Sequence, residues 1–229
     1  TQGQRERLKE LLASLPGGPA PKSRPAAYRP AVTVKRKAIE QNHLILAFPA
    51  PAYLDPRRAQ VLLFSALLGG GCSSRLFQEL REERGLCYTV YSYVADHADT
   101  GLLGIYAAVS PDQERRALET ARQVVLELAE YGPTQEEVDR VREQAKANLL
   151  MGNESVQARM GQMGASALLY GRVKETQELL DEYSAVTREQ LRDLAGELFR
   201  MECASLSAVG RVSPAAEYAA WLGRHGQIT

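Results

Sequence analysis

The stretch LREERGLCYTV, residues 80–90, joins a charged helical run to a strand-like run through one glycine. Gly85 is the residue type that ends helices in the left-handed conformation, and an alternating strand pattern opens directly after it. Arg81 therefore belongs to the last turn of the predicted helix, and Tyr88 to the start of the predicted strand. We expect the two side chains to approach each other across the Gly85 turn.

The predicted helix, over residues 74–84, has a face that could bind a carbonyl group. Phe77, Arg81 and Arg84 share this face, because they follow the i, i+4, i+7 spacing of a helix. A guanidinium keeps its proton and presents several donors, and the Tyr88 hydroxyl adds one more. Together they could hold a peptide carbonyl and the negative charge that grows on it during hydrolysis. The alternative interpretation makes Arg81 a solvated surface charge and Tyr88 a half-buried strand aromatic.

The predicted strand after Gly85 shows the alternation of a half-buried strand. Successive side chains of a strand point to opposite faces of its sheet. Leu86, Tyr88 and Val90 are therefore expected to share one face, and Cys87, Thr89 and Tyr91 to lie on the other.

Strand and helix patterns cover most of the remaining chain. Strands come first, helices follow, and one strand returns late, an order that predicts an α+β fold with an antiparallel sheet packed by helices. The predicted strands are residues 31–39, 42–50, 86–95, 101–109 and 203–210, and the predicted helices are residues 4–15, 57–68, 74–84, 112–131, 134–151, 155–170, 175–184, 188–200 and 213–221.

Several helix starts are marked by capping residues. Asp55 with Pro56 offers a cap followed by proline at the first helical position. Three capping boxes pair Ser or Thr with Gln or Glu three residues later, namely Ser110 with Gln113, Thr134 with Glu137, and Thr187 with Gln190.

Composition and charge exclude several classes of function. The 229 residues are 45% hydrophobic and carry 28 basic and 28 acidic side chains, with no long basic block. A zero net charge disfavours nucleic acid and anionic membranes as partners, and no apolar run is long enough to span a bilayer. The three cysteines lack C-x-x-C spacing, which disfavours a disulfide framework and a cysteine zinc site. Free thiols are typical of a cytoplasmic protein.

The histidines do not form a metal-binding motif. His43, His97 and His225 lie far apart, and H-E-x-x-H and H-x-x-E-H are both missing. We therefore expect no complete zinc site on this chain. The run GGGCSSR, residues 69–75, has glycines before a helix but lacks the G-K-[ST] ending of a phosphate loop. A flexible connector is the preferred interpretation of this run, and phosphate binding is the alternative.

The first thirty residues differ in character from the rest. Residues 4–15 form a predicted helix whose leucine stripe has no partner nearby, and residues 16–30 contain five prolines and two glycines, as linkers do. The chain begins at Thr1 without an initiator Met or a signal peptide, so we expect a piece of a longer or processed polypeptide. The stripe consists of Leu8, Leu11, Leu12 and Leu15.

The sequence LLGGGCSSRLFQELREERGLCYTVYSYVADHADTGLLGIYAAVSP, residues 67–111, closely resembles the signature of the C-terminal half of the pitrilysin / mitochondrial-processing-peptidase family. The similarity continues to about residue 210, and its SSRLFQELRE-x-RGL-x-Y block is specific. Members of that family have two homologous α+β halves that close like a clamshell around a peptide. The resemblance implies that Arg81 and Tyr88 bind the substrate backbone near the scissile bond, and that Phe77 lines the same chamber.

The resemblance also implies what this chain lacks. In the family, the first half carries zinc on an H-x-x-E-H motif, and zinc-bound water attacks the carbonyl. This chain would then be the substrate-binding C-terminal half of a zinc endopeptidase for peptides or unfolded segments, inactive without a zinc-bearing N-terminal half or subunit. The alternative is a non-catalytic homologue or partner subunit, and homodimers or heterodimers are both compatible with it. Residues 31–212 would be the peptidase-like domain, residues 1–15 the last helix of the missing half, and residues 213–229 a tail.

Overall fold

Five strands form one sheet in the order β1-β5-β2-β4-β3 in the computed structural model, which describes residues 2–15, 18 and 26–224. The α+β class is confirmed. Three of the four strand pairings are antiparallel, whereas β1 runs parallel to β5 and makes the sheet mixed. A parallel pair needs a long crossover, and nearly the whole domain lies between these two strands. The strands are β1 (Val32–Arg36), β2 (Asn42–Ala50), β3 (Cys87–Asp96), β4 (Gly101–Val109) and β5 (Ser205–Gly210).

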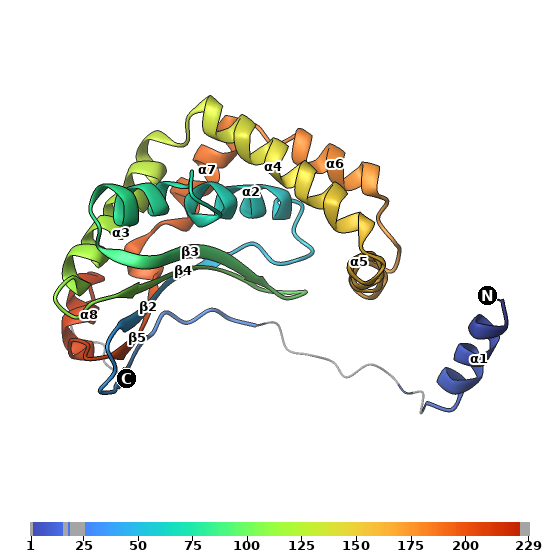
Figure 1. Cartoon of the computed structure of the whole chain (residues 1–229), viewed down its shortest axis with the longest axis horizontal. Coiled ribbons are helices and arrows are strands. Elements are labelled where there is room, and N and C mark those ends of the chain that lie inside the picture. Colours follow the sequence, from blue (N-terminus) through green and yellow to red (C-terminus); the bar gives the residue numbers. More distant parts are fainter. Residues whose placement is uncertain (1, 16–17, 19–25, 225–229) are drawn as a thin grey trace.

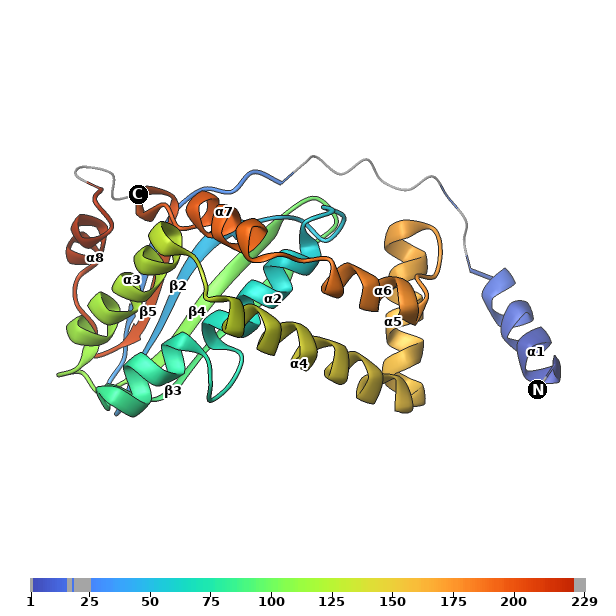
Figure 2. The same ribbon diagram turned by 90° about the horizontal axis from the view of Figure 1, so that it is seen from above.

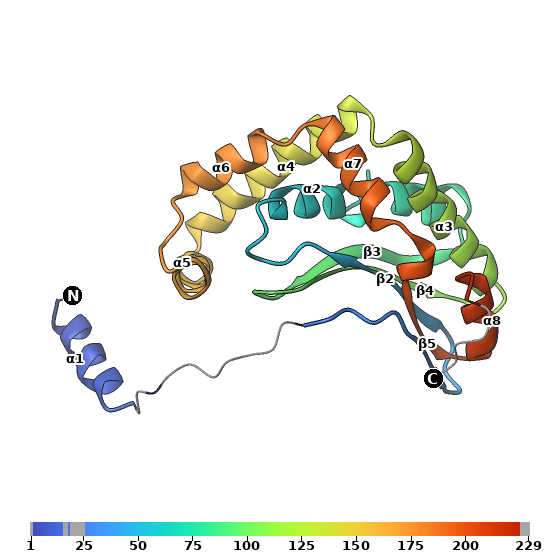
Figure 3. The same cartoon turned by 180° about the vertical axis from the view of Figure 1, so that it is seen from behind.

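The helices cover one face of this sheet, as Figures 1 and 3 show from opposite sides. Figure 2 shows α2, α3 and α7 lying over the strands, while α4, α5 and α6 extend past the end of the sheet. The helices are α1 (Gln2–Ala13), α2 (Arg58–Gly69), α3 (Glu114–Tyr131), α4 (Gln135–Glu154), α5 (Val156–Tyr170), α6 (Thr176–Ser184), α7 (Arg188–Leu198) and α8 (Ala215–Trp221), with a π-helix η1 (Phe77–Glu83) and a 3₁₀ turn η2 (Met201–Cys203).

The main core lies between the sheet and the helices above it. Phe48 on β2 is fully buried, and its ring meets Phe199 edge to face at a centroid distance of 4.9 Å. Phe64 on α2 lies 5.4 Å from the same Phe199 ring. Aromatic pairs at such distances add to the free energy of burial. These three rings join β2, α2 and the residue that follows α7 into one core.

A second, smaller buried cluster is polar and links β2, α3 and α8. The Glu114 carboxylate accepts hydrogen bonds from Asn42 Nδ2 and the Tyr218 hydroxyl, each at 2.5 Å. Burial and the bond to Glu114 raise the pKa of Tyr218 above its usual range, so its hydroxyl stays a donor. Buried residues therefore continue past residue 212, with Tyr218 in α8 and Leu222 directly after it.

The observed helix starts test the expected caps. Both threonine capping boxes are confirmed, at Thr134 and at Thr187. The box at Ser110 is wrong, because Ser110 heads a turn in which its carbonyl accepts from Gln113 N–H at 3.0 Å, and α3 begins only at Glu114. Asp55 also lies in a turn before its helix. Its carboxylate accepts a hydrogen bond of 2.8 Å from Arg57 N–H, and α2 begins at Arg58.

The leucine stripe of the first helix stays exposed. Leu8, Leu11, Leu12 and Leu15 are 56%, 56%, 53% and 62% exposed, and no residue of α1 is buried. An apolar stripe of this kind is normally buried against a partner. The expected boundaries at residues 15, 30 and 212 stay predictions, and linker residues 16–17 and 19–25 lie outside the described part of the chain.

Candidate functional site

The helix that carries Arg81 is a π-helix, η1, and not the α-helix that its spacing predicts. Leu76 and Leu80 anchor it, because both side chains are fully buried in the core. Gly85 ends it with φ of +59°, as expected, and Leu86 N–H donates to Leu80 O at 2.7 Å across the turn. Short π-helical turns occur often at functional sites, where they shift side chains relative to an α-helix.

The strand that carries Tyr88 contains a β-bulge at that residue. Cys87 pairs with Val109 and Thr89 with Ala108, so Tyr88 is the extra residue between them. Tyr88 is 73% exposed, while Leu86 and Val90 are only 3% and 6% exposed. The expected alternation of Leu86, Tyr88 and Val90 on one face is therefore wrong. The bulge turns Tyr88 out of the core, a re-aiming that bulges near active sites often produce.

Arg81 lies between two aromatic rings. Its guanidinium carbon is 4.7 Å from the centroid of Phe77 and 4.7 Å from that of Tyr88. A cation over two ring faces is held in place without using its N–H donors. Glu82 Oε1 lies 3.8 Å from Arg81 Nε, which is longer than a hydrogen bond. The three residues that the sequence predicts at this site are thus brought together, with donors still available.

Arg84 does not join this group. Its guanidinium pairs with the Glu79 carboxylate at 2.8 Å instead. A π-helix advances more residues per turn than an α-helix, so the i+7 neighbour of Phe77 is rotated away from it. The face predicted from α-helical spacing therefore ends at Arg81.

Cys87 lies beside the pair but is not a nucleophile. Its side chain is buried, and burial raises the pKa of the thiol to about 11, against the smaller opposing effect of the Arg81 charge. The reactive form of cysteine is the thiolate. At neutral pH Cys87 is a neutral thiol that supports the strand.

The strand register adds residues that the sequence pattern did not indicate. Tyr91 on β3 lies opposite Tyr106 on β4, and the two rings stack with centroids 4.9 Å apart. His43 Nδ1 on β2 is 2.7 Å from the Tyr106 hydroxyl. The register places these side chains on one face of the sheet, opposite the face on which the helices lie (Figure 1). Because these residues are far apart in the sequence, the cluster can be recognised only from the strand pairing.

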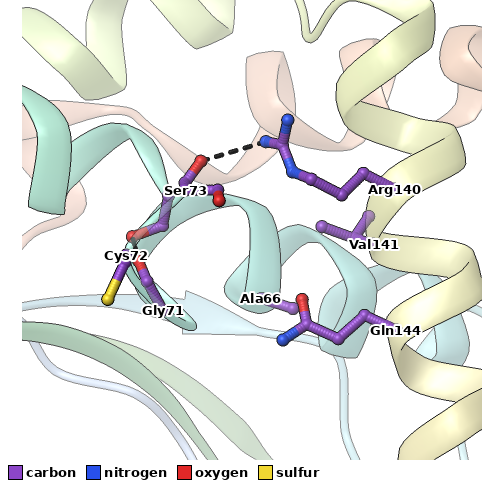
Figure 4. A pocket seen from close by; sticks show the side chains of 8 residues that line it. Ala66, Gly71, Cys72, Ser73, Arg140, Val141 and Gln144 are labelled. Atoms are coloured by element: carbon purple, nitrogen blue, oxygen red, sulfur yellow. Dashed lines mark hydrogen bonds between the residues drawn. The ribbon is translucent and has the colours of Figure 1, made fainter.

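The glycine-rich loop lines a separate pocket of about 240 Å³ (Figure 4). Arg140 on α4 donates to Ser73 O at 3.0 Å, and Arg75 makes two hydrogen bonds of 2.7 and 2.8 Å to Glu137. Burial would raise the pKa of Glu137, but its bonds to Arg75 and to Thr134 N–H lower it below the usual range. The loop is thus anchored to α4 by hydrogen bonds from both arginines.

The described residues contain no metal site of their own. No group of three or more His, Cys, Asp and Glu residues in that part of the chain is placed to hold a metal ion. His225 lies outside the described residues. Within the same residues, no helix combines the length and apolar character required to cross a membrane.

Gly85 offers a stability test of the turn that links Arg81 to Tyr88. An added Cβ would meet no atom within 4 Å at Gly85 or at Gly71, but only Gly85 has a positive φ. Gly85→Ala should therefore lower the free energy of unfolding by about 1–2 kcal/mol, the cost of a left-handed alanine. Gly71→Ala is the matched control and should be close to neutral in urea unfolding. Equal effects of the two changes would contradict the left-handed turn.

Comparisons with known proteins agree on the family. The family described as the peptidase M16 inactive domain matches residues 4–145, more than half of the chain. An uncharacterized zinc protease of Streptomyces coelicolor is 39% identical over 171 residues, which are 75% of this chain and 37% of that protein. The uncharacterized zinc protease YmxG of Bacillus subtilis is 36% identical over 165 residues, 72% of this chain and 40% of that protein. The chain thus spans about two fifths of the length of these relatives.

Solved structures share the fold. A crystal structure of a peptidase M16 inactive domain from Pseudomonas fluorescens has a TM-score of 0.82 and 26% identity, covering 93% of this chain and 52% of that one. A protease from Helicobacter pylori has a TM-score of 0.79 and 20% identity, covering 92% of this chain and 52% of that one. The second likeness concerns the fold alone.

Proposed function

This chain belongs to the peptidase M16 inactive-domain family, and on that premise we propose that it is the substrate-binding half of a zinc-dependent endopeptidase. The relatives named as zinc proteases support the enzyme class, and their greater length leaves room for a second, zinc-bearing half. The substrates would be peptides or unfolded segments.

One observation carries the proposal. Arg81 lies between Phe77 and Tyr88 with its donors available, and the bulge exposes the Tyr88 side chain beside it. A peptide carbonyl placed there accepts hydrogen bonds from the guanidinium and from the phenol. As the carbonyl carbon becomes tetrahedral, its oxygen gains negative charge, and both bonds strengthen. Donors fixed before the reaction stabilise that charge without reorganising.

The rings around Arg81 also explain why an arginine is required. The guanidinium carbon lies 4.7 Å from the centroids of both the Phe77 and Tyr88 rings, and its planar group can still direct several N–H groups toward a bound carbonyl. A lysine would keep the charge but would lose the planar contacts and the fork of donors. Arg81 is therefore assigned to binding the substrate backbone, and Tyr88 to the developing oxyanion.

The described residues do not fit a zinc site, because no suitable ligand group is present among them. Attack on the carbonyl is therefore assigned to the partner half, and this chain holds and orients the substrate. The family's description as an inactive domain agrees with that division. It also favours a second candidate function, in which the chain is a non-catalytic subunit that presents peptides to a zinc-bearing subunit.

Reconstitution tests the proposal. The isolated chain should cleave no unfolded peptide, and adding a zinc-bearing N-terminal half, encoded upstream or separately, should produce cleavage that a chelator abolishes. Readdition of zinc should restore the activity, which separates metal loss from unfolding. Cleavage by the isolated chain, or cleavage that the chelator leaves intact, would contradict the proposal. Peptide binding without any cleavage in the assembled protein would favour the non-catalytic subunit.

A further inference from the structure

Three strands place an aromatic cluster on the open face of the sheet. Tyr91 of β3 stacks on Tyr106 of β4 at 4.9 Å, with the ring planes 29° apart. His43 of β2 contacts the Tyr106 hydroxyl at 2.7 Å. Each ring is thus fixed by a neighbour on another strand, and the cluster presents a pre-formed aromatic surface.

Within the described residues, the cluster lies on a part of this face that other segments leave exposed. Tyr91 is 42% exposed, and the helices lie on the opposite side of the sheet (Figures 1 and 3). The segment that leads into β1 crosses the other end of the face, where Ala26 N–H donates to Asp99 and the Tyr28 hydroxyl to Ala47 O. That segment therefore does not cover the part of the sheet that carries Tyr91 and Tyr106.

The cluster is continuous with the Arg81–Tyr88 site. Tyr88 is exposed at the bulge, and Thr89 and Tyr91 follow it along the open side of β3, since they pair with Ala108 and Tyr106. Three strand residues span about 10 Å. An extended peptide advances by the same amount in three residues.

From this continuity we infer that Tyr91, Tyr106 and His43 form a second subsite for a substrate side chain. It would take an aromatic side chain two or three residues from the carbonyl that Arg81 and Tyr88 hold. The inference rests on the proposed function, because that carbonyl sets the register of the peptide.

The composition of the open face explains the choice of an aromatic side chain. Among the strand positions that the register places on this face, none is acidic, and Lys35 adds a positive charge near one edge. A basic substrate side chain would find no carboxylate here and would be repelled by Arg81. An aromatic ring can stack on the exposed Tyr91 ring, a contact that adds to simple burial.

A peptide series tests this subsite in the assembled protein. Peptides that differ only in Phe, Ala, Lys or Glu, two or three residues from the cleaved bond, are compared by kcat/KM and by calorimetric binding to the zinc-depleted assembly. We expect the phenylalanine peptide to exceed the alanine peptide roughly two- to tenfold, the range of one aromatic pair. Tyr91→Ala should bring that ratio close to one, and Tyr91→Phe should preserve it, because the ring makes the contact.

Tyr131→Ala provides the matched control, since Tyr131 is 65% exposed at the end of α3 and away from this face. That variant should keep the wild-type preference. An unchanged ratio in Tyr91→Ala, or a preference for Lys or Glu, would overturn the subsite while leaving hydrolysis intact. Absence of hydrolysis together with Tyr91-dependent binding of the phenylalanine peptide would overturn the proposed function and support the subsite.

Discussion

Tyr88→Phe should lower the turnover of the assembled peptidase about a hundred- to thousand-fold, the loss typical of removing one oxyanion donor. The change removes one hydroxyl and keeps the ring that packs on Arg81 at 4.7 Å. Since the ring position is kept, the loss should appear in kcat more than in KM. Steady-state kinetics on an unfolded peptide measures both constants.

Two further measurements separate chemistry from folding in that experiment. Tyr88 is 73% exposed, so Tyr88→Phe should leave the melting temperature unchanged. Arg81→Lys should impair peptide binding despite keeping the charge, because it loses the planar fork between the rings. Full activity of the Tyr88→Phe variant, or a lower stability of that variant, would contradict the oxyanion role and indicate that Tyr88 is purely structural.

The largest expected effect on stability is at Phe48. Phe48→Ala should lower the free energy of unfolding by about 3–5 kcal/mol, because it empties a fully buried position between the sheet and the helices. It also removes the edge-to-face contact with Phe199. Urea unfolding followed by circular dichroism measures the change.

Leu168→Ala is the matched control for that experiment. Leu168 is 87% exposed on α5, so its truncation should change stability by no more than about 0.5 kcal/mol. A loss at Phe48 as small as the loss at Leu168 would mean that the core is not centred on the sheet and α7.

Local features of this fold were predictable from the sequence because neighbouring residues determine them. The Gly85 turn and the boxes at Thr134 and Thr187 each depend on residues a few positions apart, and the structure confirms all three. Helices and strands follow their hydrophobic periods in the same way. Phe77 and Arg81 also came together as expected, since their spacing holds even in a π-helix.

Features that depend on distant partners were not predictable in this way. The bulge at Tyr88 arises in the pairing of Cys87 and Thr89 with β4, which no local pattern encodes. β1 pairs in parallel with β5 across almost the whole domain. The capping box expected at Ser110–Gln113 was wrong for the same reason. Glu114, the residue that follows the expected box, is held by hydrogen bonds from Asn42 and Tyr218, which are distant in sequence.

The candidate site also has a part that the local sequence predicts and a part that only the tertiary structure reveals. Arg81 and Tyr88 are seven positions apart with one glycine turn between them, so a sequence pattern can relate them. Tyr91, Tyr106 and His43 come from three strands, and only the register brings them together. Specificity in this chain is therefore inferred from tertiary structure, whereas carbonyl binding is inferred from a short motif.

The most direct test of the account uses a peptide that carries a phosphinate in place of the scissile amide. This tetrahedral anion resembles the transition state, so its affinity reports groups that act on the developing oxyanion. In the assembled protein, Tyr88→Phe should weaken phosphinate binding about a hundred- to thousand-fold. The same change should weaken the parent peptide, kept uncleaved by zinc depletion, far less. Equal weakening of the two ligands would show that Tyr88 only binds the ground state, and would contradict its role at the oxyanion.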